Sequence, residues 1–571
     1  MSETGVGLVT IALIILPLIV IVIFVLASYL HDSLHGTGLS GSKVEVVEQL
    51  LFGGSDYLRN VVVLAITISQ IFSPNLLLES MYVSRLQAIS LIIGRTMSFA
   101  LCVFFWNRIS SMGFQSIGAY LMHRYENQYI LALYYMNSVL GALYIYNIYA
   151  GPVIFGTLEQ LKSNRAFFLV LIGYVSICSF GGMRTTLVTV CILWVMEYIG
   201  KAMLVQHTYT AGTFDLKGIE SEHDMCKSSN PLTSFVGSFC LLMAVQPGYT
   251  VFHAAESPLT SKISMAVGLL LFWLNSVGSI FSANALKAFG HKYELNGTRW
   301  LYGLLRYPKG PNDQQKAFIH SQVFQTKNVS SYMDEAWNLD SSDIFVFVTC
   351  VYFPLAAFFC LRVTILSGEI SEKFVPHLLR SAIIRSGSEL QRMYTALHAC
   401  LWVIVLSGLI VWDKHVQLAE TRPLNLFEPH YCAALLPGSA LIIAFGSLFP
   451  QAKLVPLALA WLISLALSGP PIAMYLWSTE YEDVFHSMVD WRLSELTNWD
   501  CLGAWSLFLQ FFLNFALCLI LSAVFGGIRN WFQQYDLKYM TYGRQPSSFT
   551  MAIHRPTQVR HSWDADYFAH R

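Results

Sequence analysis

Apolar stretches long enough to cross a bilayer recur along almost the whole chain, and this recurrence constrains the fold more than any other feature. A spanning helix needs about 20 mostly apolar residues, and roughly thirteen stretches meet that length. Their approximate limits are 5–30, 58–80, 86–107, 128–150, 166–181, 183–205, 232–254, 263–289, 343–366, 396–412, 432–449, 453–477 and 503–526. The sequence therefore predicts an all-α polytopic membrane protein.

Composition supports this class and excludes several functions. Hydrophobic residues make up 55% of the chain and charged residues 12%, against about 25% charged residues in ordinary soluble domains. Acidic and basic residues balance at 35 each, so no net charge favours nucleic acid. The first apolar stretch lacks a preceding basic region and is long enough to span, which predicts a retained helix rather than a cleaved signal.

The motifs of common membrane enzymes and pumps are absent from the sequence. It contains no Walker loop, GxSxG or HExxH motif, and its 11 cysteines show neither a CxxC pair nor Cys/His ligand spacing. We therefore expect no enzymatic activity, cofactor, metal site or disulfide framework.

Basic residues predict the orientation in the membrane, because cytoplasmic connections are enriched in lysine and arginine. With the N-terminus outside, the inner connections hold Arg108, Arg124, Arg184, Lys262, Lys373, Arg380, Arg385, Arg392, Lys453, Lys538, Arg544, Arg555 and Arg560. The long segment 290–342 then lies outside and carries two glycosylation sequons, at Asn296 and Asn328. We expect a plasma-membrane protein with its C-terminus in the cytoplasm.

The apolar stretch 58–80 is interrupted near its middle by a polar patch around Pro74. Ser69, Gln70, Ser73 and Asn75 lie where hydrocarbon-facing residues are expected. In secondary transporters, such interruptions form solute and ion sites near the bilayer midplane. The alternative is a proline kink in which the serine hydroxyls bond back to their own helix.

Further short motifs follow this patch in order. They are SQIFSPNLLLES (69–80), SIGAYLMHRYEN (116–127), FGGMRTTLVT (180–189), QPGYTVFHAAESP (246–258), LSGEISEKFV (366–375), MYTALHAC (393–400), SELTNWDCL (494–502) and NWFQQYDL (530–537). In this order they resemble the active urea permeases of the sodium–solute symporter family, from about residue 55 to about residue 540. The motif at 116–127 resembles a short amphipathic segment of that family, and the motif at 180–189 resembles its turn into a helix.

The resemblance implies an inverted-repeat core of five plus five helices, with solute held between the broken first helices of the two repeats. The first of these is 58–80. Its counterpart is 183–205 or 232–254, and the glycine pair before 183–205 favours that stretch. The implied organisation is an extra N-terminal helix and loop (1–57), the transporter core (58–449), peripheral helices (450–537) and a cytoplasmic tail (538–571).

The chain departs from the family's pattern at its ion site and at several polar positions. The family's sodium site uses a hydroxyl pair, which falls here on Ala356 and Ala357. Other family positions carrying aspartate or tryptophan are Gln246, Thr250, Val190, Ile71 and Ser73 in this chain. Because sodium requires several oxygen ligands, we expect this chain to lack the sodium coupling of the family.

The resemblance and the polar patch together predict a path for a small polar solute such as urea or a polyamine, moved by alternating access. The candidate substrate-binding residues are Ser69, Gln70, Phe72, Ser73, Asn75, Gln246 and Tyr249. Their expected role is hydrogen bonding and lining rather than chemistry.

Ionisable residues in or near the spans leave proton coupling open, because such residues are functional hypotheses by default. The candidates are Glu79, Glu197, His253 and Glu256, each with the alternative that it faces a membrane interface. Arg362 has two interpretations as well: its side chain extends to the interface, or its charge replaces that of sodium.

A second hypothesis is a transporter-derived receptor or regulatory membrane protein that has lost coupling. The double alanine and the missing aspartates and tryptophans favour it. Solute uptake separates it from the transporter hypothesis. A membrane enzyme would need clustered ionisable residues at one side of the bilayer, and loops 290–342 and 369–395 carry no such motif.

Overall fold

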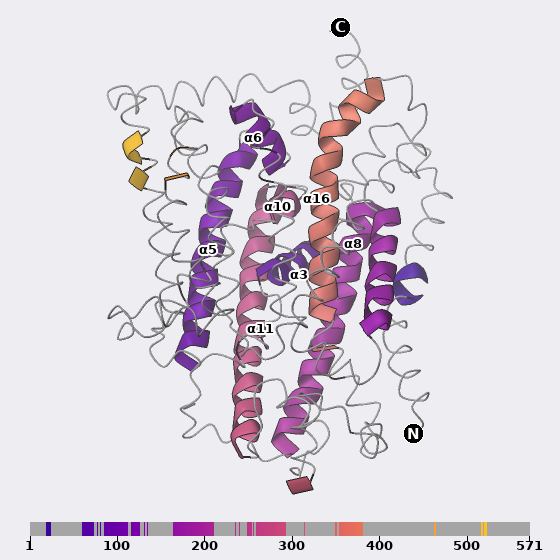
Figure 1. The fold of residues 1–571 in the computed structure, drawn as a ribbon, viewed down its shortest axis with the longest axis vertical. Helices are drawn as coiled ribbons and strands as arrows, with labels where there is room; N and C mark the ends of the chain where they lie inside the picture. The colour runs from indigo at the N-terminus through magenta and orange to yellow at the C-terminus, as the bar shows by residue number, and fades with distance from the viewer. Residues whose placement is uncertain are drawn as a thin grey trace, which may run out of the picture. The chain divides into compact units, whose positions relative to one another are not determined.

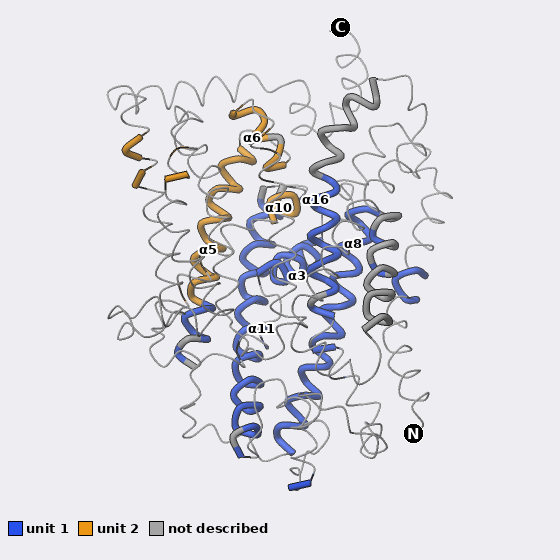
Figure 2. The backbone as a smooth tube through the Cα atoms, viewed as in Figure 1, with its two compact units in different colours: residues 1–92, 142–227, 255–426 blue, residues 93–141, 228–254, 427–571 orange. Residues whose placement is uncertain are grey.

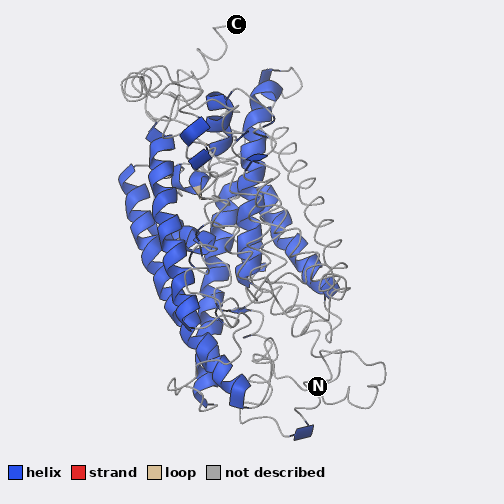
Figure 3. Cartoon of the chain, turned by 60° about the vertical axis from the view of Figure 1, so that its left-hand side comes forward, coloured by secondary structure: helices blue, strands red, loops and turns tan. Residues whose placement is uncertain are grey.

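The structure is a computed structural model whose described residues lie almost entirely in helices. These residues are 19–23, 60–72, 77, 80, 85–111, 116–125, 129, 131, 134, 164–210, 235, 239, 248–253, 255, 258–292, 313–314, 346, 349–350, 353–380, 459, 462–463, 516–517 and 519–521. Among them there is no strand (Figure 3). An all-α fold is therefore confirmed for this part of the chain, whereas the count of thirteen spans stays a prediction.

The chain divides into two compact units, each made of three discontinuous segments (Figure 2). Unit 1 comprises residues 1–92, 142–227 and 255–426, and unit 2 comprises residues 93–141, 228–254 and 427–571. The domain boundaries inferred from the sequence stay predictions.

Within the part of the chain that the structure describes, three helices are long and apolar enough to cross a membrane, by length and composition. They lie in α5 (Arg85–Ser111), in the second part of α8 (Asn164–Thr210) and in α11 (Pro258–Lys292). Each corresponds to a span predicted from the sequence: 86–107, 183–205 and 263–289. Their helical conformation and apolar character are thereby confirmed.

An exposed apolar stripe runs along one side of α5. Its members recur every three or four residues, which is the spacing of one helix face: Leu86, Ile89, Ile93, Met97, Leu101 and Phe104. Monomeric soluble proteins rarely expose apolar stripes of this kind, whereas lipid requires them. The pattern agrees with a membrane-embedded chain.

Helix α8 is a helical hairpin that reverses direction at Gly182. This residue has φ 63° and ψ −151°, a conformation that is nearly restricted to glycine. Cys178 Sγ lies 3.8 Å from Thr189 Oγ1, although two residues that are 11 positions apart in a straight helix would be separated by about 16 Å. The two limbs lie side by side (Figure 1). The boundary predicted between 166–181 and 183–205 is confirmed.

Substitution of Gly182 by alanine is expected to destabilise the hairpin by about 1–3 kcal/mol, because a Cβ is strained at this φ and ψ. Thermal unfolding of the purified protein measures the loss. Gly278→Ala on α11 is the matched control, since a Cβ there meets nothing within 4 Å. Because alanine favours helix by up to about 1 kcal/mol over glycine, Gly278→Ala should leave stability unchanged or raise it. Equal effects of the two substitutions would contradict the assignment of strain to Gly182.

Two short helices lie within motifs that the sequence analysis singled out. Helix α6 (Ile117–Tyr125) matches the predicted short segment at 116–127. Helix α10 (Tyr249–His253) follows a turn at Gly248, so the prediction of one uninterrupted helix over 232–254 is wrong at this point. The physical reason lies in the preceding pair, since Pro247 lacks a backbone donor and a Pro-Gly pair favours a turn.

Helix α16 (Phe353–Arg380) extends well beyond the predicted end of the span 343–366. Hydropathy falls after Leu366, but the residues that follow include good helix formers, with apolar side chains at helical spacing at Ile370, Phe374 and Leu378. The hydropathy pattern therefore marked the end of the apolar part rather than the end of the helix. Lys373 and Arg380, predicted in a loop, lie on this helix.

The interior of unit 1 is formed where α3 (Val61–Phe72) packs against α8, α11 and α16 (Figure 1). Asn60 begins α3 as an N-cap: its Oδ1 accepts a hydrogen bond from Val62 N at 3.0 Å. All side chains from Leu64 to Phe72 are buried. Gly268 of α11 permits the close approach, because a Cβ there would lie 3.1 Å from the carbonyl oxygen of Ala65.

Candidate functional site

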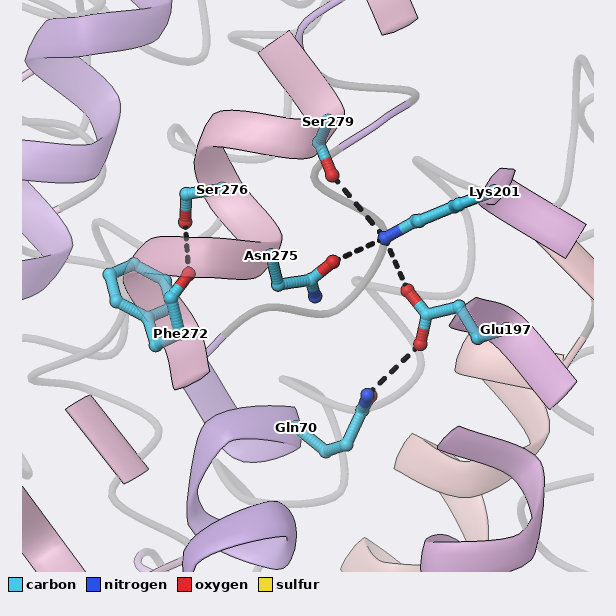
Figure 4. A network of polar contacts seen from close by, with 7 residues as sticks. All are labelled: Gln70, Glu197, Lys201, Phe272, Asn275, Ser276 and Ser279. Carbon is cyan, nitrogen blue, oxygen red and sulfur yellow. Dashed lines mark hydrogen bonds and ion pairs between the residues drawn. The ribbon is translucent and has the colours of Figure 1, made fainter. Parts of the chain in front are cut away.

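A buried network of polar side chains joins α3, α8 and α11 inside unit 1 (Figure 4). Gln70 belongs to the last turn of α3, Glu197 and Lys201 lie one turn apart on α8, and Asn275 and Ser279 lie one turn apart on α11. Because residues four apart share a helix face, each helix presents its polar groups on one side. The exposed fraction of each of these five residues is 9% or less.

Lys201 is the centre of the network. Its Nζ donates to Glu197 Oε1 at 2.5 Å, to Asn275 Oδ1 at 2.5 Å and to Ser279 Oγ at 3.3 Å. An ammonium carries three donors, so these three acceptors satisfy it completely. Glu197 supplies the balancing negative charge as an ion pair within the same helix.

The energetic cost of this arrangement indicates a function beyond packing. Burying an ammonium and a carboxylate costs several kcal/mol per ion, which is offset only when geometry and hydrogen bonding are both good. Glu197 and Asn275 lie near the middle of the long apolar stretches Gly182–Thr210 and Pro258–Lys292. Ionisable groups within membrane-spanning segments are candidate sites for solutes or ions by default.

Gln70 connects the ion pair to α3 and keeps one polar atom unused. Its Nε2 donates to Glu197 Oε2 at 3.0 Å. This contact fixes the amide orientation, because the carboxylate only accepts and the flipped amide would present an oxygen to it. Gln70 Oε1 is buried and has no hydrogen-bond partner among the residues that the structure describes. It is therefore an acceptor available to a donor that enters the site.

The other predicted residues on α3 play different parts. Ser69 is buried, and its Oγ donates to the Ile66 carbonyl at 2.8 Å, which is the back-bonding that the kink interpretation expected. Phe72 is buried at the end of the described helix. The polar patch continues into Ser73 and Asn75, which lie outside the described residues.

The two alanines at the expected sodium position lie in a buried part of α16. Ala356 and Ala357 are fully or almost fully buried, and every described side chain from Phe353 to Leu366 is buried as well. A helix buried on all sides is an interior helix. The hydroxyls further along it are engaged: Thr364 Oγ1 lies 2.9 Å from Thr186 Oγ1, and Ser367 Oγ donates to the Val363 carbonyl at 2.6 Å.

Glu197 and Arg362 differ in their relation to the network. The alternative that Glu197 faces a membrane interface is wrong, because its carboxylate is 2% exposed and bonded to Gln70 and Lys201. Arg362 is 7% exposed, with its guanidinium 5.6 Å from the centre of the Phe358 ring. The cation held by the Glu197 carboxylate is therefore the ammonium of Lys201.

Tyr249 belongs to unit 2, so the structure does not join it to Gln70 in one site. It is fully buried at the beginning of α10. Nearby in the same unit, the Trp106 and Phe252 rings lie 6.0 Å apart, and a Cβ on Gly248 would lie 2.4 Å from Trp106. Gln246, Asn296, Asn328, Glu79 and Glu256 lie outside the described residues, and the side chain of His253 is not described.

The stretches 183–205 and 232–254 are the two predicted alternatives for the first helix of the second repeat, and that assignment stays a prediction. The stretch 183–205 lies within an unbroken helical limb, since Gly182 is the single non-helical residue inside Asn164–Thr210. A turn at Gly248 interrupts 232–254. The glycine pair at Gly181 and Gly182 forms a hairpin turn between helices.

Three members of the network were not predicted from the sequence: Lys201, Asn275 and Ser279. A signal for the lysine was present, because Glu197 and Lys201 are an i,i+4 pair of opposite charge inside an apolar span. No local signal indicated Asn275 and Ser279, because one asparagine and one serine are common in apolar helices. Their role depends on which face of α11 meets α8.

Apolar helices, an exposed apolar stripe and a buried polar network are together typical of an integral membrane protein, and the described residues are all-α. Among solved structures, the chain is similar to a Na⁺-coupled sialic acid symporter in its substrate-bound outward-open state. The TM-score is 0.54 at 11% identity, and the match covers 90% of this chain and 97% of that chain. No family model and no curated protein matches the sequence. At this identity, the similarity shows the fold.

Proposed function

We propose that this protein carries a small polar solute across a membrane by alternating access. The observation that carries the proposal is the buried network in which Gln70 of α3 meets the Glu197–Lys201 ion pair of α8. Similarity in fold to a Na⁺-coupled sialic acid symporter supports the transport class. The inverted repeat, the orientation with the N-terminus outside and the plasma-membrane location are part of the same proposal.

The chemistry at Gln70 favours a solute with N–H donors, such as urea or a polyamine. Gln70 Oε1 is a buried acceptor with no described partner, and leaving such an atom unpaired costs about 1–3 kcal/mol. An N–H group of the solute would satisfy it. Gln246, Asn75 and Ser73 are proposed to complete the hydrogen-bonding path, with Phe72 and Tyr249 as lining residues.

The proposed transport does not use the family's sodium site. Ala356 and Ala357 offer no side-chain oxygen, and both are packed in the interior of unit 1. Protons remain the candidate coupling ion. Uptake measured with sodium replaced by choline, and at stepped pH, tests both statements; loss of uptake on sodium removal would contradict sodium independence.

Substitution of Gln70 by alanine is expected to raise the KM for uptake about tenfold or more, because it removes a hydrogen-bonding group worth about 1.5 kcal/mol. Uptake of radiolabelled urea and of a polyamine in a permease-null host measures the effect. Thr67→Val is the matched control: Thr67 lies one turn earlier on α3, is buried and bonds to the Val63 carbonyl of its own helix.

Surface labelling verifies that each variant reaches the membrane. Unchanged uptake of every tested solute in the Gln70→Ala, Asn75→Ala and Gln246→Ala variants would overturn the proposed path. An equal loss in Thr67→Val would assign the effect of Gln70→Ala to packing rather than to solute binding.

A second candidate function is a receptor or regulatory membrane protein on the transporter scaffold. The close-packed Ala356 and Ala357 favour it, because they remove the hydroxyls through which the family couples transport to sodium. Accumulation of solute against its gradient excludes this candidate. Ligand-dependent signalling without flux excludes transport.

A further inference from the structure

We propose that the ammonium of Lys201 is a tethered cation that occupies a site built for a free alkali metal ion. The site is formed by Glu197 Oε1, Asn275 Oδ1 and Ser279 Oγ (Figure 4). This inference goes beyond the proposed function, since it concerns cation binding and its test does not depend on flux.

The oxygen atoms around Lys201 Nζ are of the kind that binds a metal cation. The three atoms around Nζ are a carboxylate, an amide and a hydroxyl oxygen, and they come from two helices. Hard metal cations prefer such oxygen ligands in proteins. The sequence separation of 74 residues between Lys201 and Asn275 shows that tertiary packing assembles the set.

The buried charge of Glu197 requires a cation in the site. Glu197 is 2% exposed and Asn275 3% exposed, so the site is shielded from water. Without the ammonium, the Glu197 carboxylate would be a buried charge with no counter-ion, which is strongly unfavourable. A small cation that entered in its place would restore neutrality and accept the same three oxygens as ligands.

The site also lies next to α3 and is connected to it. The second carboxylate oxygen of Glu197 accepts the Gln70 amide, so occupancy of the cation site is linked to the last turn of α3 by one hydrogen bond. A covalently attached cation keeps the site permanently occupied. A free ion would occupy the site to an extent set by its concentration. The lysine therefore makes occupancy of the site independent of sodium and potassium.

The test removes the tethered charge and supplies a free one. Purified full-length protein carrying Lys201→Ala is expected to unfold at a higher temperature in sodium chloride or potassium chloride than in choline chloride at equal ionic strength. Wild type should show no difference between the salts. The charge-neutral variant Glu197→Gln/Lys201→Met should show none either, because it has no carboxylate to balance. Binding of labelled sodium or rubidium to the three proteins provides a second measurement.

Each outcome decides the proposal. A stabilising effect of an alkali cation confined to Lys201→Ala supports it, as does recovery of a monodisperse protein only when that variant is purified in an alkali salt. Lys201→Ala that is stable but insensitive to all the salts overturns it. So does Lys201→Ala that fails to fold in every salt, whether or not the double variant folds, because the oxygens then accept the ammonium alone.

Discussion

Glu197→Gln lowers the free energy of unfolding by about 3–5 kcal/mol, which is the expected cost of removing one partner of a buried ion pair. The substitution preserves the shape of the side chain but leaves the Lys201 ammonium with neutral oxygens from Asn275 and Ser279. It also replaces an acceptor of the Gln70 amide by a group that can present either oxygen or nitrogen. Thermal or chemical denaturation in detergent measures the loss.

The double variant Glu197→Gln/Lys201→Met is the control for this prediction. Because it removes both charges together, it should be clearly more stable than Glu197→Gln alone. Alkali salts should not rescue Glu197→Gln, since that variant lacks the carboxylate that would hold a free cation. A single variant as stable as the wild type would show that the ion pair contributes little, and the buried network would lose its energetic significance.

Gly200→Ala is expected to destabilise the protein by about 3 kcal/mol, at the upper end of the usual overpacking cost, and to disturb the neighbouring Lys201. A Cβ on Gly200 would lie 1.8 Å from Thr349 Oγ1 and 2.6 Å from Thr349 Cβ, so one of the two backbones must move. Thr349 is fully buried and its hydroxyl donates to the Val346 carbonyl at 3.1 Å. Thermal unfolding and, for transport, the KM of uptake are the measurements.

A double-mutant cycle tests whether the clash with Thr349 causes the loss of stability in Gly200→Ala. Thr349→Ala removes the hydroxyl but keeps the Cβ, so Gly200→Ala/Thr349→Ala should recover part of the lost stability. Gly278→Ala, with open space around its Cβ, shows the effect of the same substitution without a clash. Additive effects in the cycle would contradict a direct contact between Gly200 and Thr349.

Local sequence patterns predicted the helices well where all the patterns favoured the same conformation. The spans 86–107 and 263–289 correspond to α5 and α11, because continuous apolar segments must pair their backbone groups internally in lipid. The boundary at Gly182 was also predictable, since a glycine pair between two apolar runs favours a turn. Hydropathy failed at the end of α16, where the helix continues into a polar segment.

The candidate site was predicted in part. Gln70 and Glu197 were both selected as polar residues within apolar spans, but nothing local indicated that they contact each other. Their separation is 127 residues. Lys201 was overlooked although its spacing from Glu197 placed the two on one face, and Asn275 and Ser279 could not be distinguished from other polar residues of long helices.

The sequence by itself determined that this is an apolar, helical membrane protein, that the stretch 58–80 carries a polar patch, and that alanines stand at positions 356 and 357. These properties depend on residue type and local spacing, which are written in the chain. Only the tertiary structure decided that α3, α8 and α11 bring Gln70, Glu197, Lys201 and Asn275 together. The physical reason is that helix packing selects which faces meet, and the close approach at Gly268 and Gly200 sets that choice.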